Sequence, residues 1–375
     1  MRLVRLANFV MPRSGGLRTA LRCLGEGYLA AGHEPVLIVP GPTASDEETP
    51  HGRVITLPGP EVPGSGGYRV LGTGRRRLTR LLDSLAPDRI EVSDRSTLRW
   101  TGRWARERGV PSIMVSHESL DGLLAVWGVP AAIRSGLADV ANRRTAAAYD
   151  RIVCTTSWAA AEFRRLGVEN LVEVPLGVDL DTFHPRRRDP AVRARWAPDG
   201  EVLLVHCGRL SGEKHPEVSV DALRALRDAG VPAALVVIGD GPRRAALAYR
   251  AARLPVRFAG FVPDRSVIAG LLASADVVLA PGPVETFGLA GLEALACGTP
   301  VVVNSASALP EVVGPAGIAA AGTGAAFASG VRDLLDRPEG ERRAAARARA
   351  ELFTWPAAVD GFLRAHGVRA EVPSW

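Results

Sequence analysis

Short runs of apolar, mostly β-branched residues alternate with longer helical patterns along the chain. The runs are residues 3–10, 36–39, 54–57, 89–92, 112–116, 151–154 and 171–174, followed by 202–207, 234–238, 256–258, 276–280 and 300–304. Strands that alternate with helices are typical of parallel sheets, because a parallel crossover needs a connection about as long as a helix. The pattern therefore predicts an α/β fold with helices on both faces of its sheets.

The alternation breaks once, over residues 175–190. This stretch is rich in turn residues and has an arginine-rich tail. The chain has 375 residues, which is more than one hydrophobic core usually supports. We therefore predict two open α/β domains, residues 1–180 and 181–354, with a ligand cleft between them.

The charge balance limits the classes of partner. With 46 basic and 40 acidic residues the chain carries a net charge of +6, which suits anionic ligands or an anionic membrane surface. Aromatic residues make up 5% of the chain and no tract mixes them with clustered arginines, so we expect no nucleic acid partner. The four cysteines stand singly without C-x-x-C spacing, and no run suits a signal peptide or a membrane span. We therefore expect reduced cysteines and a cytoplasmic protein.

Four stretches place side chains directly after predicted strands, where open parallel sheets bind their ligands. Gly15 and Gly16 follow the first run and open a helix, so they form either a phosphate-binding turn or an ordinary strand-to-helix turn. Arg209 and Lys214 follow the run at 202–207. Lys214 is the only lysine in the chain, which favours a diphosphate clamp over two solvated loop charges.

The other two stretches hold a histidine and two glutamates. His117 follows the run at 112–116 and is either a ligand contact or a satisfied core residue. Glu285 lies in a loop and Glu293 in a predicted helix. They accept hydrogen bonds from the hydroxyl pairs of a sugar or ribose, or they are a surface loop acid and a solvated helix acid. Between them, backbone amides at the helix start suit a phosphate, and they belong to Thr286, Phe287, Gly288 and Leu289.

The run Glu285-Thr-Phe-Gly-Leu-Ala-Gly-Leu-Glu-Ala-Leu-Ala-Cys-Gly-Thr-Pro-Val301 resembles the signature of family 4 of the retaining glycosyltransferases, which have the GT-B fold. Other stretches follow in the family's order: Gly15-Gly16, His117, Pro-Leu-Gly-Val-Asp at 175–179, Gly-Arg-Leu-Ser-Gly-Glu-Lys at 208–214, Val237–Pro242 and Phe258–Val262. The resemblance spans the chain. It implies two Rossmann-like domains with parallel sheets facing across a cleft, and a closing helix at 355–375 that crosses back to the first domain.

The resemblance also implies roles for the residues named above. The donor would be a nucleotide sugar bound by the second domain, and the first domain would bind the acceptor. The resemblance implies that the diphosphate is bound by Arg209, Lys214, Gly15 and Gly16. The transferred sugar would be bound by Glu285 and His117, and the ribose by Glu293. The base would lie against the backbone at Phe261 and Val262.

The implied reaction is hexosyl transfer with retention of configuration. Fixed cations would stabilise the charge that develops on the departing diphosphate. We expect no cofactor and no metal, with the nucleotide sugar as co-substrate. The triplet Asp179-Leu-Asp181 matches the D-x-D metal motif of another transferase fold, but it lies in the predicted linker. The loop 304–311 lacks the glycine pair that the family often has there, so its contacts are not assigned.

Residues 191–215 resemble actinobacterial mannosyltransferases that use GDP-mannose. Transfer of mannose to a lipid, glycan or small-molecule acceptor is therefore the first expectation. UDP-glucose and UDP-N-acetylglucosamine remain alternative donors. A nucleotide-sugar epimerase or a phosphorylase of similar fold, and a catalytically silent binding protein, remain alternative functions.

A basic helix is predicted in the first domain, with Arg75, Arg76, Arg77 and Arg80. Such a helix either rests on anionic lipid, which would place the protein peripherally on the inner face of the plasma membrane, or is simply solvated. The preceding loop, 58–74, is rich in glycine and proline and is a candidate lid for the acceptor.

Overall fold

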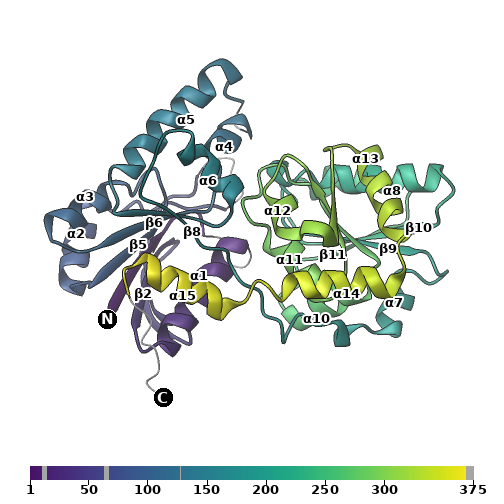
Figure 1. Cartoon of the computed structure of the whole chain (residues 1–375), viewed down its shortest axis with the longest axis horizontal. Coiled ribbons are helices and arrows are strands. Elements are labelled where there is room, and N and C mark those ends of the chain that lie inside the picture. Colours follow the sequence, from purple (N-terminus) through teal and green to yellow (C-terminus); the bar gives the residue numbers. More distant parts are fainter. Residues whose placement is uncertain (11–14, 63–66, 127, 369–375) are drawn as a thin grey trace. The chain divides into compact units, whose positions relative to one another are not determined.

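The computed structural model describes residues 1–10, 15–62, 67–126 and 128–368. These residues form two compact units (Figure 1). The first comprises Met1–Leu176 together with helix α15 (Trp355–Ala365), and the second comprises Gly177–Thr354. The division after Leu176 lies within the turn-rich stretch where the apolar runs are interrupted.

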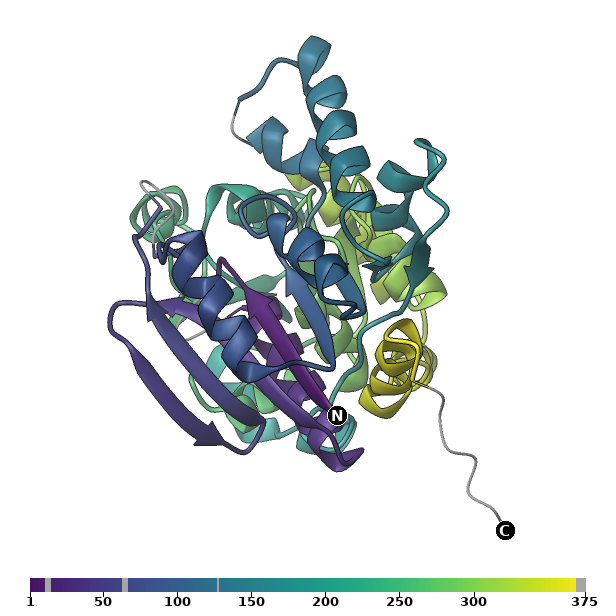
Figure 2. The ribbon, with the colours of Figure 1, turned by 90° about the vertical axis from the view of Figure 1, so that its left-hand side faces the viewer.

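The first unit is built on one sheet of eight strands within the described residues. The strands are β1 (Arg2–Ala7), β2 (Glu34–Gly41), β3 (Ser45–Thr49), β4 (Gly52–Pro58), β5 (Arg89–Ser93), β6 (Ser112–Ser116), β7 (Arg151–Cys154) and β8 (Leu171–Glu173). Their order is β3-β4-β2-β1-β5-β6-β7-β8. All neighbours pair in parallel except β3, which is antiparallel to β4 and lies at one edge (Figure 2).

The helices of the first unit cover both faces of this sheet (Figure 1). They are α1 (Gly16–Ala30), α2 (Arg75–Leu85), α3 (Trp100–Glu107), α4 (Leu120–Val126), α5 (Ala131–Ala146), α6 (Ser157–Arg164) and α15. Side chains from alternate strand positions, such as Val4, Leu6, Ile90 and Val92, form the core with α2, α3 and α6. Thr156 caps α6 by accepting a hydrogen bond from the Ala159 amide at 3.1 Å.

Helix α15 is far in sequence from the rest of the first unit but packs against its helix α1 (Figure 1). The packing is close: a Cβ added at Gly27 of α1 would lie 2.2 Å from a methyl group of Val359. His366, just after the helix, lies 3.3 Å from the buried Glu91 carboxylate on β5. The closing helix of the sequence prediction thus ends at Ala365, and residues 369–375 lie outside the described part.

The second unit holds a six-stranded sheet within the described residues, and all its neighbouring strands are parallel. The strands are β9 (Val202–Cys207), β10 (Ala233–Ile238), β11 (Val256–Gly260), β12 (Val277–Ala280), β13 (Val301–Asn304) and β14 (Gly317–Ala320). Their order, β11-β10-β9-β12-β13-β14, is that of a Rossmann sheet.

The second unit's sheet is likewise packed against helices (Figure 1). They are α7 (Pro190–Trp196), α8 (Pro216–Asp228), α9 (Arg244–Arg250), α10 (Arg265–Ser274), α11 (Leu289–Ala296), α12 (Leu309–Val313), α13 (Gly324–Leu335) and α14 (Glu339–Ala350), with 3₁₀ turns η1 (Pro185–Arg187), η2 (Gly212–Lys214) and η3 (Gly314–Ala316). Strands β10 and β13 are apolar and buried along their whole length, as continuous apolar runs predict for strands covered on both faces of a sheet.

Candidate functional site

The second unit has a topological switch point between β9 and β12. The chain proceeds from β9 to β10 and β11 on one side of the sheet, and from β12 to β13 and β14 on the other. The loops that leave the carboxyl ends of β9 and β12 therefore diverge and leave a crevice where such sheets bind ligands. The two loops carry Arg209, Lys214 and Glu285 together with the predicted amides of residues 286–288.

The loop after β9 is held by the loop after β10. The Gly208 amide donates to the Ile238 carbonyl, and the Leu210 amide to the Asp240 carbonyl, both at 3.0 Å. This approach requires glycine at 239, where φ is 132° and a Cβ would lie 1.9 Å from the Gly208 oxygen. Arg209 is thereby presented on a fixed backbone, half-buried, between two anchored neighbours.

Lys214 and Glu285, predicted separately from two different loops, form an ion pair. Lys214 ends η2 after β9, and Glu285 lies in the loop after β12, so the pair spans the switch point. Its side chains are 31% and 22% exposed, which leaves both groups accessible to an incoming ligand. The pair offers an ammonium for phosphate and a carboxylate for sugar hydroxyls within one contact.

The segment between the two predicted glutamates turns sharply into helix α11. Gly288 adopts a left-handed conformation with φ 79°, and a Cβ there would lie 2.3 Å from Leu309. The Phe287 ring is buried and packs edge-on against Phe353 at 6.0 Å between centroids. Phe287 therefore offers only its backbone to a ligand. The amide of Leu289, in the first turn, has no acceptor within the helix and suits an anion.

Glu293 lies inside α11 and is 9% exposed. Burial raises its pKa, and the nearby Arg265 guanidinium acts against that rise. Arg265 Nη2 donates to Glu293 Oε1 at 2.9 Å. The sequence reasoning missed Arg265, although a cation in the first turn of a helix is a recognisable departure from helix electrostatics.

The predicted base-lining residues lie just after β11. Phe261 is 40% exposed, which is unusual for a large aromatic side chain, and Val262 is half-buried. Both precede Asp264, which caps α10 by accepting from the Ser266 amide at 2.8 Å. The same short segment therefore carries the predicted base contacts and Arg265.

The other predicted site residues belong to the first unit. His117 follows β6, is half-buried, and its Nε2 lies 3.1 Å from Ser93 Oγ at the end of β5. Burial lowers the pKa of His117 to about 4, so its imidazole is neutral at physiological pH. A neutral imidazole suits a hydrogen bond to a sugar hydroxyl better than a charge contact to phosphate. Gly15 caps α1 with φ 113°, and Gly16 is the first residue of that helix, while 11–14 lie outside the described residues.

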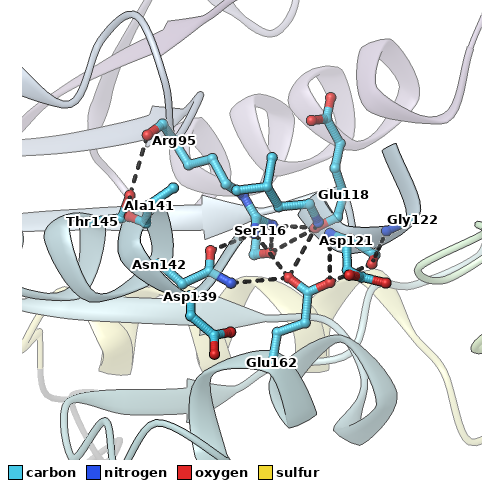
Figure 3. A network of polar contacts seen from close by, with 12 residues as sticks. Arg95, Ser116, Glu118, Asp121, Gly122, Asp139, Ala141, Asn142, Thr145 and Glu162 are labelled. Atoms are coloured by element: carbon cyan, nitrogen blue, oxygen red, sulfur yellow. Dashed lines mark hydrogen bonds and ion pairs between the residues drawn. The ribbon is translucent and has the colours of Figure 1, made fainter. Parts of the chain in front are cut away.

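A buried polar network, which sequence reasoning also missed, holds the segment after His117 (Figure 3). Arg95 donates to the Glu118 carbonyl, to Ser116 Oγ and, at 3.0 Å, to Asn142 Oδ1. Glu162 of α6 accepts from the amides of Leu120 and Asp121 at 3.2 Å, so it caps α4. The Glu118 carboxylate points away from the network (Figure 3), and burial raises its pKa.

The Asp179-Leu-Asp181 triplet stabilises a backbone turn. Asp179 Oδ1 accepts from the Asp181 and Thr182 amides at 3.1 and 2.9 Å, which forms a local turn. Across the described ranges, no three His, Cys, Asp or Glu side chains group where they could hold a metal ion. None of the four cysteines, all of which lie in the described ranges, takes part in a disulfide.

The basic helix α2 differs from the expectation in one respect. Leu78, Leu82 and Leu85 are buried in the core, so the helix has no apolar side left for lipid. Its exposed arginines border a groove of about 460 Å³ between α2 and α3, lined by Arg75, Arg76, Thr79, Arg80, Trp100, Arg103, Trp104, Glu107 and Arg108. Part of the candidate lid, 63–66, lies outside the described residues. None of the described helices combines the length and apolar character needed to span a bilayer.

Comparison with known proteins links this geometry to sugar transfer. The model of the glycosyl transferase 4-like domain matches residues 15–177, and that of the glycosyl transferases group 1 matches residues 189–351. The chain is 54% identical over 372 residues to the GDP-mannose-dependent alpha-(1-6)-phosphatidylinositol dimannoside mannosyltransferase of Mycobacterium tuberculosis, covering 99% of this chain and 97% of the relative. It is 29% identical to a GDP-mannose-dependent alpha-mannosyltransferase of the same species, covering 84% and 82%.

Solved structures agree on the fold. Sucrose-phosphate synthase from Thermosynechococcus elongatus superposes with a TM-score of 0.78 at 21% identity, covering 98% of each chain. Alpha,alpha-trehalose 6-phosphate synthase from Burkholderia multivorans gives 0.72 at 16% identity, covering 98% of this chain and 96% of that one. The predicted α/β class with two Rossmann-like domains is confirmed.

Proposed function

Because the chain belongs to family 4 of the retaining glycosyltransferases, and is therefore a hexosyltransferase, we propose that it transfers mannose from GDP-mannose to a phosphatidylinositol dimannoside in an α-(1-6) linkage. The observation that carries the proposal is the 54% identity, over nearly the whole of both chains, to the mycobacterial enzyme named for that reaction. The names of more distant relatives also favour GDP-mannose over the UDP-sugars. An epimerase and a silent binding protein receive no support from these relatives.

We assign the donor to the second unit and the acceptor to the first. As the bond between mannose C1 and the diphosphate oxygen breaks, negative charge builds on the diphosphate. Arg209 and Lys214 supply fixed cations for that charge, and the α11 amides add dipoles. Glu285 holds Lys214 in place before the donor arrives, and it then accepts hydrogen bonds from the sugar hydroxyls.

The stereochemistry follows from the two linkages. GDP-mannose carries mannose in the α configuration and the proposed product is also α, so the configuration is retained. We propose attack by the acceptor hydroxyl from the leaving-group face, with its proton passing to the departing phosphate oxygen. His117, neutral at physiological pH, positions a sugar hydroxyl in this scheme.

We further propose that the reaction needs no metal and no cofactor, because the switch point already carries two cations for the diphosphate. Addition of a chelator to the purified enzyme should leave kcat unchanged. A loss of activity that Mg²⁺ or Mn²⁺ restores would contradict this part of the proposal.

The test of the function measures binding and transfer separately. Thermal shift of the purified protein with GDP, GDP-mannose, UDP-glucose and UDP-N-acetylglucosamine identifies the donor, and radiolabelled transfer to phosphatidylinositol dimannoside identifies the acceptor. We expect stabilisation by GDP and GDP-mannose and one mannose added to the lipid. Stabilisation by a UDP-sugar alone would reject the donor, and donor binding without lipid product would reject the acceptor.

We also propose that the arginines of α2 hold the enzyme against anionic lipid at the inner face of the plasma membrane. Since Leu78, Leu82 and Leu85 are buried and Leu81 packs partly buried against the same core, this contact is electrostatic and should weaken as salt rises. Co-sedimentation with phosphatidylinositol vesicles should be lost when Arg75, Arg76, Arg77 and Arg80 are changed to glutamine. Equal binding of both proteins, or binding to neutral vesicles, would contradict it.

A further inference from the structure

Arg265 occupies a position where helix electrostatics disfavours a cation. It is the first residue of α10, directly after the capping residue Asp264. The first turn of a helix carries partial positive charge, so an arginine there is unfavourable by a few tenths of a kcal/mol to about 1 kcal/mol. A cation kept at an unfavourable helix position indicates that its side chain makes a compensating contact outside the helix.

The guanidinium is fixed by two contacts. Its Nη2 atom donates to Glu293 Oε1 at 2.9 Å. Its central carbon lies 4.8 Å from the centroid of the Phe183 ring, which is fully buried. A charged hydrogen bond together with a stacking surface holds the planar group in one orientation.

Glu293 needs such a partner if it is to act as a carboxylate. It lies inside α11, only 9% exposed, and burial favours its protonated form. To receive two ribose hydroxyls the group has to be ionised, because a protonated carboxyl loses acceptor capacity. The Arg265 bond uses Oε1, which leaves Oε2 as the oxygen that could accept from a ribose.

We propose that Arg265 is a positioning residue of the donor site, which holds the Glu293 carboxylate charged and oriented so that it grips the ribose of the nucleotide. This inference rests on the proposed function, since it requires a nucleotide sugar in the second unit. In this scheme Arg265 acts through its contacts with Glu293 and Phe183 and needs no contact with the sugar or the diphosphate. Its effect therefore falls on donor binding and leaves the chemical step almost unchanged.

The test compares GDP with 2′,3′-dideoxy-GDP, which lacks the ribose hydroxyls. Calorimetry measures both affinities for the wild type, Arg265→Met, Arg265→Lys and Glu293→Gln. We expect Arg265→Met to weaken GDP binding roughly ten- to hundredfold, the range for losing charge-assisted hydrogen bonds, and to leave dideoxy-GDP binding unchanged. Arg265→Lys should recover most of the GDP affinity. Arg253→Met, an exposed arginine of the same unit, is the matched control.

A pH series adds a readout that a purely structural role would not change. Without the guanidinium, Glu293 takes up a proton at higher pH, so KM for GDP-mannose in Arg265→Met should rise as pH falls from 8 to 6. The wild-type KM should stay flat, with kcat similar in both. The double variant with Glu293→Gln should bind GDP no more weakly than Glu293→Gln alone.

The outcomes separate this inference from the proposed function. If wild type binds neither GDP nor GDP-mannose, the function fails and the inference falls with it. If wild type binds both, but Arg265→Met binds GDP normally or loses GDP and dideoxy-GDP equally, the inference alone is overturned. If Arg265→Met does not fold, Arg265→Lys is compared with the wild type in the same way. The inference is overturned if Arg265→Lys lacks the wild-type preference for GDP over dideoxy-GDP and the flat pH profile of KM.

Discussion

The two units share one topology around their switch points, but the polar groups at these points differ in burial and in their partners. In the first unit, β1 and β5 meet there, and Asn8 and Asp94 at their ends bond to each other at 2.7 Å. Asn8 is fully buried and Asp94 is 6% exposed. In the second unit, β9 and β12 meet, and the Lys214–Glu285 pair at their ends is partly exposed.

The two switch points differ in which groups satisfy their charged side chains. Asp94 is saturated by its own chain: it accepts from Asn8, from the Ser96 and Thr97 amides, and from the Ser96 and Thr97 hydroxyls. Such a cluster stabilises the fold and has little capacity left for a ligand. Lys214 and Glu285 instead pair with each other and stay partly exposed, as a contact to be exchanged for the proposed diphosphate and sugar would require. We therefore interpret the Asn8–Asp94 contact as structural and keep the Lys214–Glu285 pair as the proposed ligand contact.

The largest expected effect is on catalysis at the second switch point. Lys214→Ala should lower kcat by roughly 10²–10³, the usual range for removing one group that stabilises developing charge. The free energy of unfolding should change by less than about 1 kcal/mol, since the pair is partly exposed. Steady-state kinetics and urea unfolding measure the two effects, and Lys214→Arg tests whether charge alone suffices. Normal turnover in Lys214→Ala would remove the lysine from the mechanism.

At the first switch point we expect a substitution to affect stability more than turnover. Asp94→Ala leaves the Ser96 and Thr97 amides without this acceptor and removes one of the two acceptors of the Asn8 side chain, so it should lower the free energy of unfolding by about 3 kcal/mol. Asp46→Ala is the matched control, because Asp46 pairs with Arg53 in an exposed bridge and should cost less than about 1 kcal/mol. Chemical denaturation of both variants checks the contrast, and equal stabilities would show that the first switch point is not structural.

A smaller effect separates backbone strain from packing in the loop that carries Glu285. Gly288→Ala combines a left-handed φ of 79° with a clash against Leu309, so we expect a loss of about 2–3 kcal/mol. Gly230 has the same φ of 79° but open space around it, so Gly230→Ala should cost about 1 kcal/mol. Thermal unfolding of the two variants measures the difference. Identical losses would mean that Leu309 moves aside.

The smallest effect concerns His206 on β9, whose Nε2 is buried without a hydrogen-bond partner among the described residues. Burial lowers its pKa to about 4, and Lys214 acts in the same direction. The unfolded chain binds this proton first as pH falls, so stability should decrease by about 1 kcal/mol from this group between pH 7.5 and 5.5. Urea unfolding should show a shallower pH dependence in His206→Gln. An unchanged slope would mean that His206 titrates normally in the folded state.

Much of the fold follows from local patterns, and its two missed strands show why the rest does not. The long apolar runs predict β1, β6, β9 and β13 because those strands are buried on both faces. β3, with the sequence Ser-Asp-Glu-Glu-Thr, is a polar edge strand that pairs, within the described part of the chain, with its antiparallel neighbour β4 alone. β14, Gly-Ile-Ala-Ala, is too short and has side chains too small to be recognised as a strand from the sequence. It forms by pairing with the edge of β13.

The site divides in the same way. Lys214 and Glu285 were predictable because each follows an apolar run, although their direct contact depends on β9 and β12 being neighbours in space. Arg265 and the Arg95–Glu162 network were missed because their partners lie far away in sequence. No periodicity in the chain marks such pairs, so only the folded arrangement reveals them.

A chain with 46 basic residues and a single lysine has a practical consequence. A lysine-specific protease has one site at which to cut, after Lys214, in the loop that leaves β9. Amine-directed labels have only this side chain and the terminal amine to modify. Digestion or labelling of the native enzyme, with and without a nucleotide, would therefore follow occupancy of one loop without any engineered reporter.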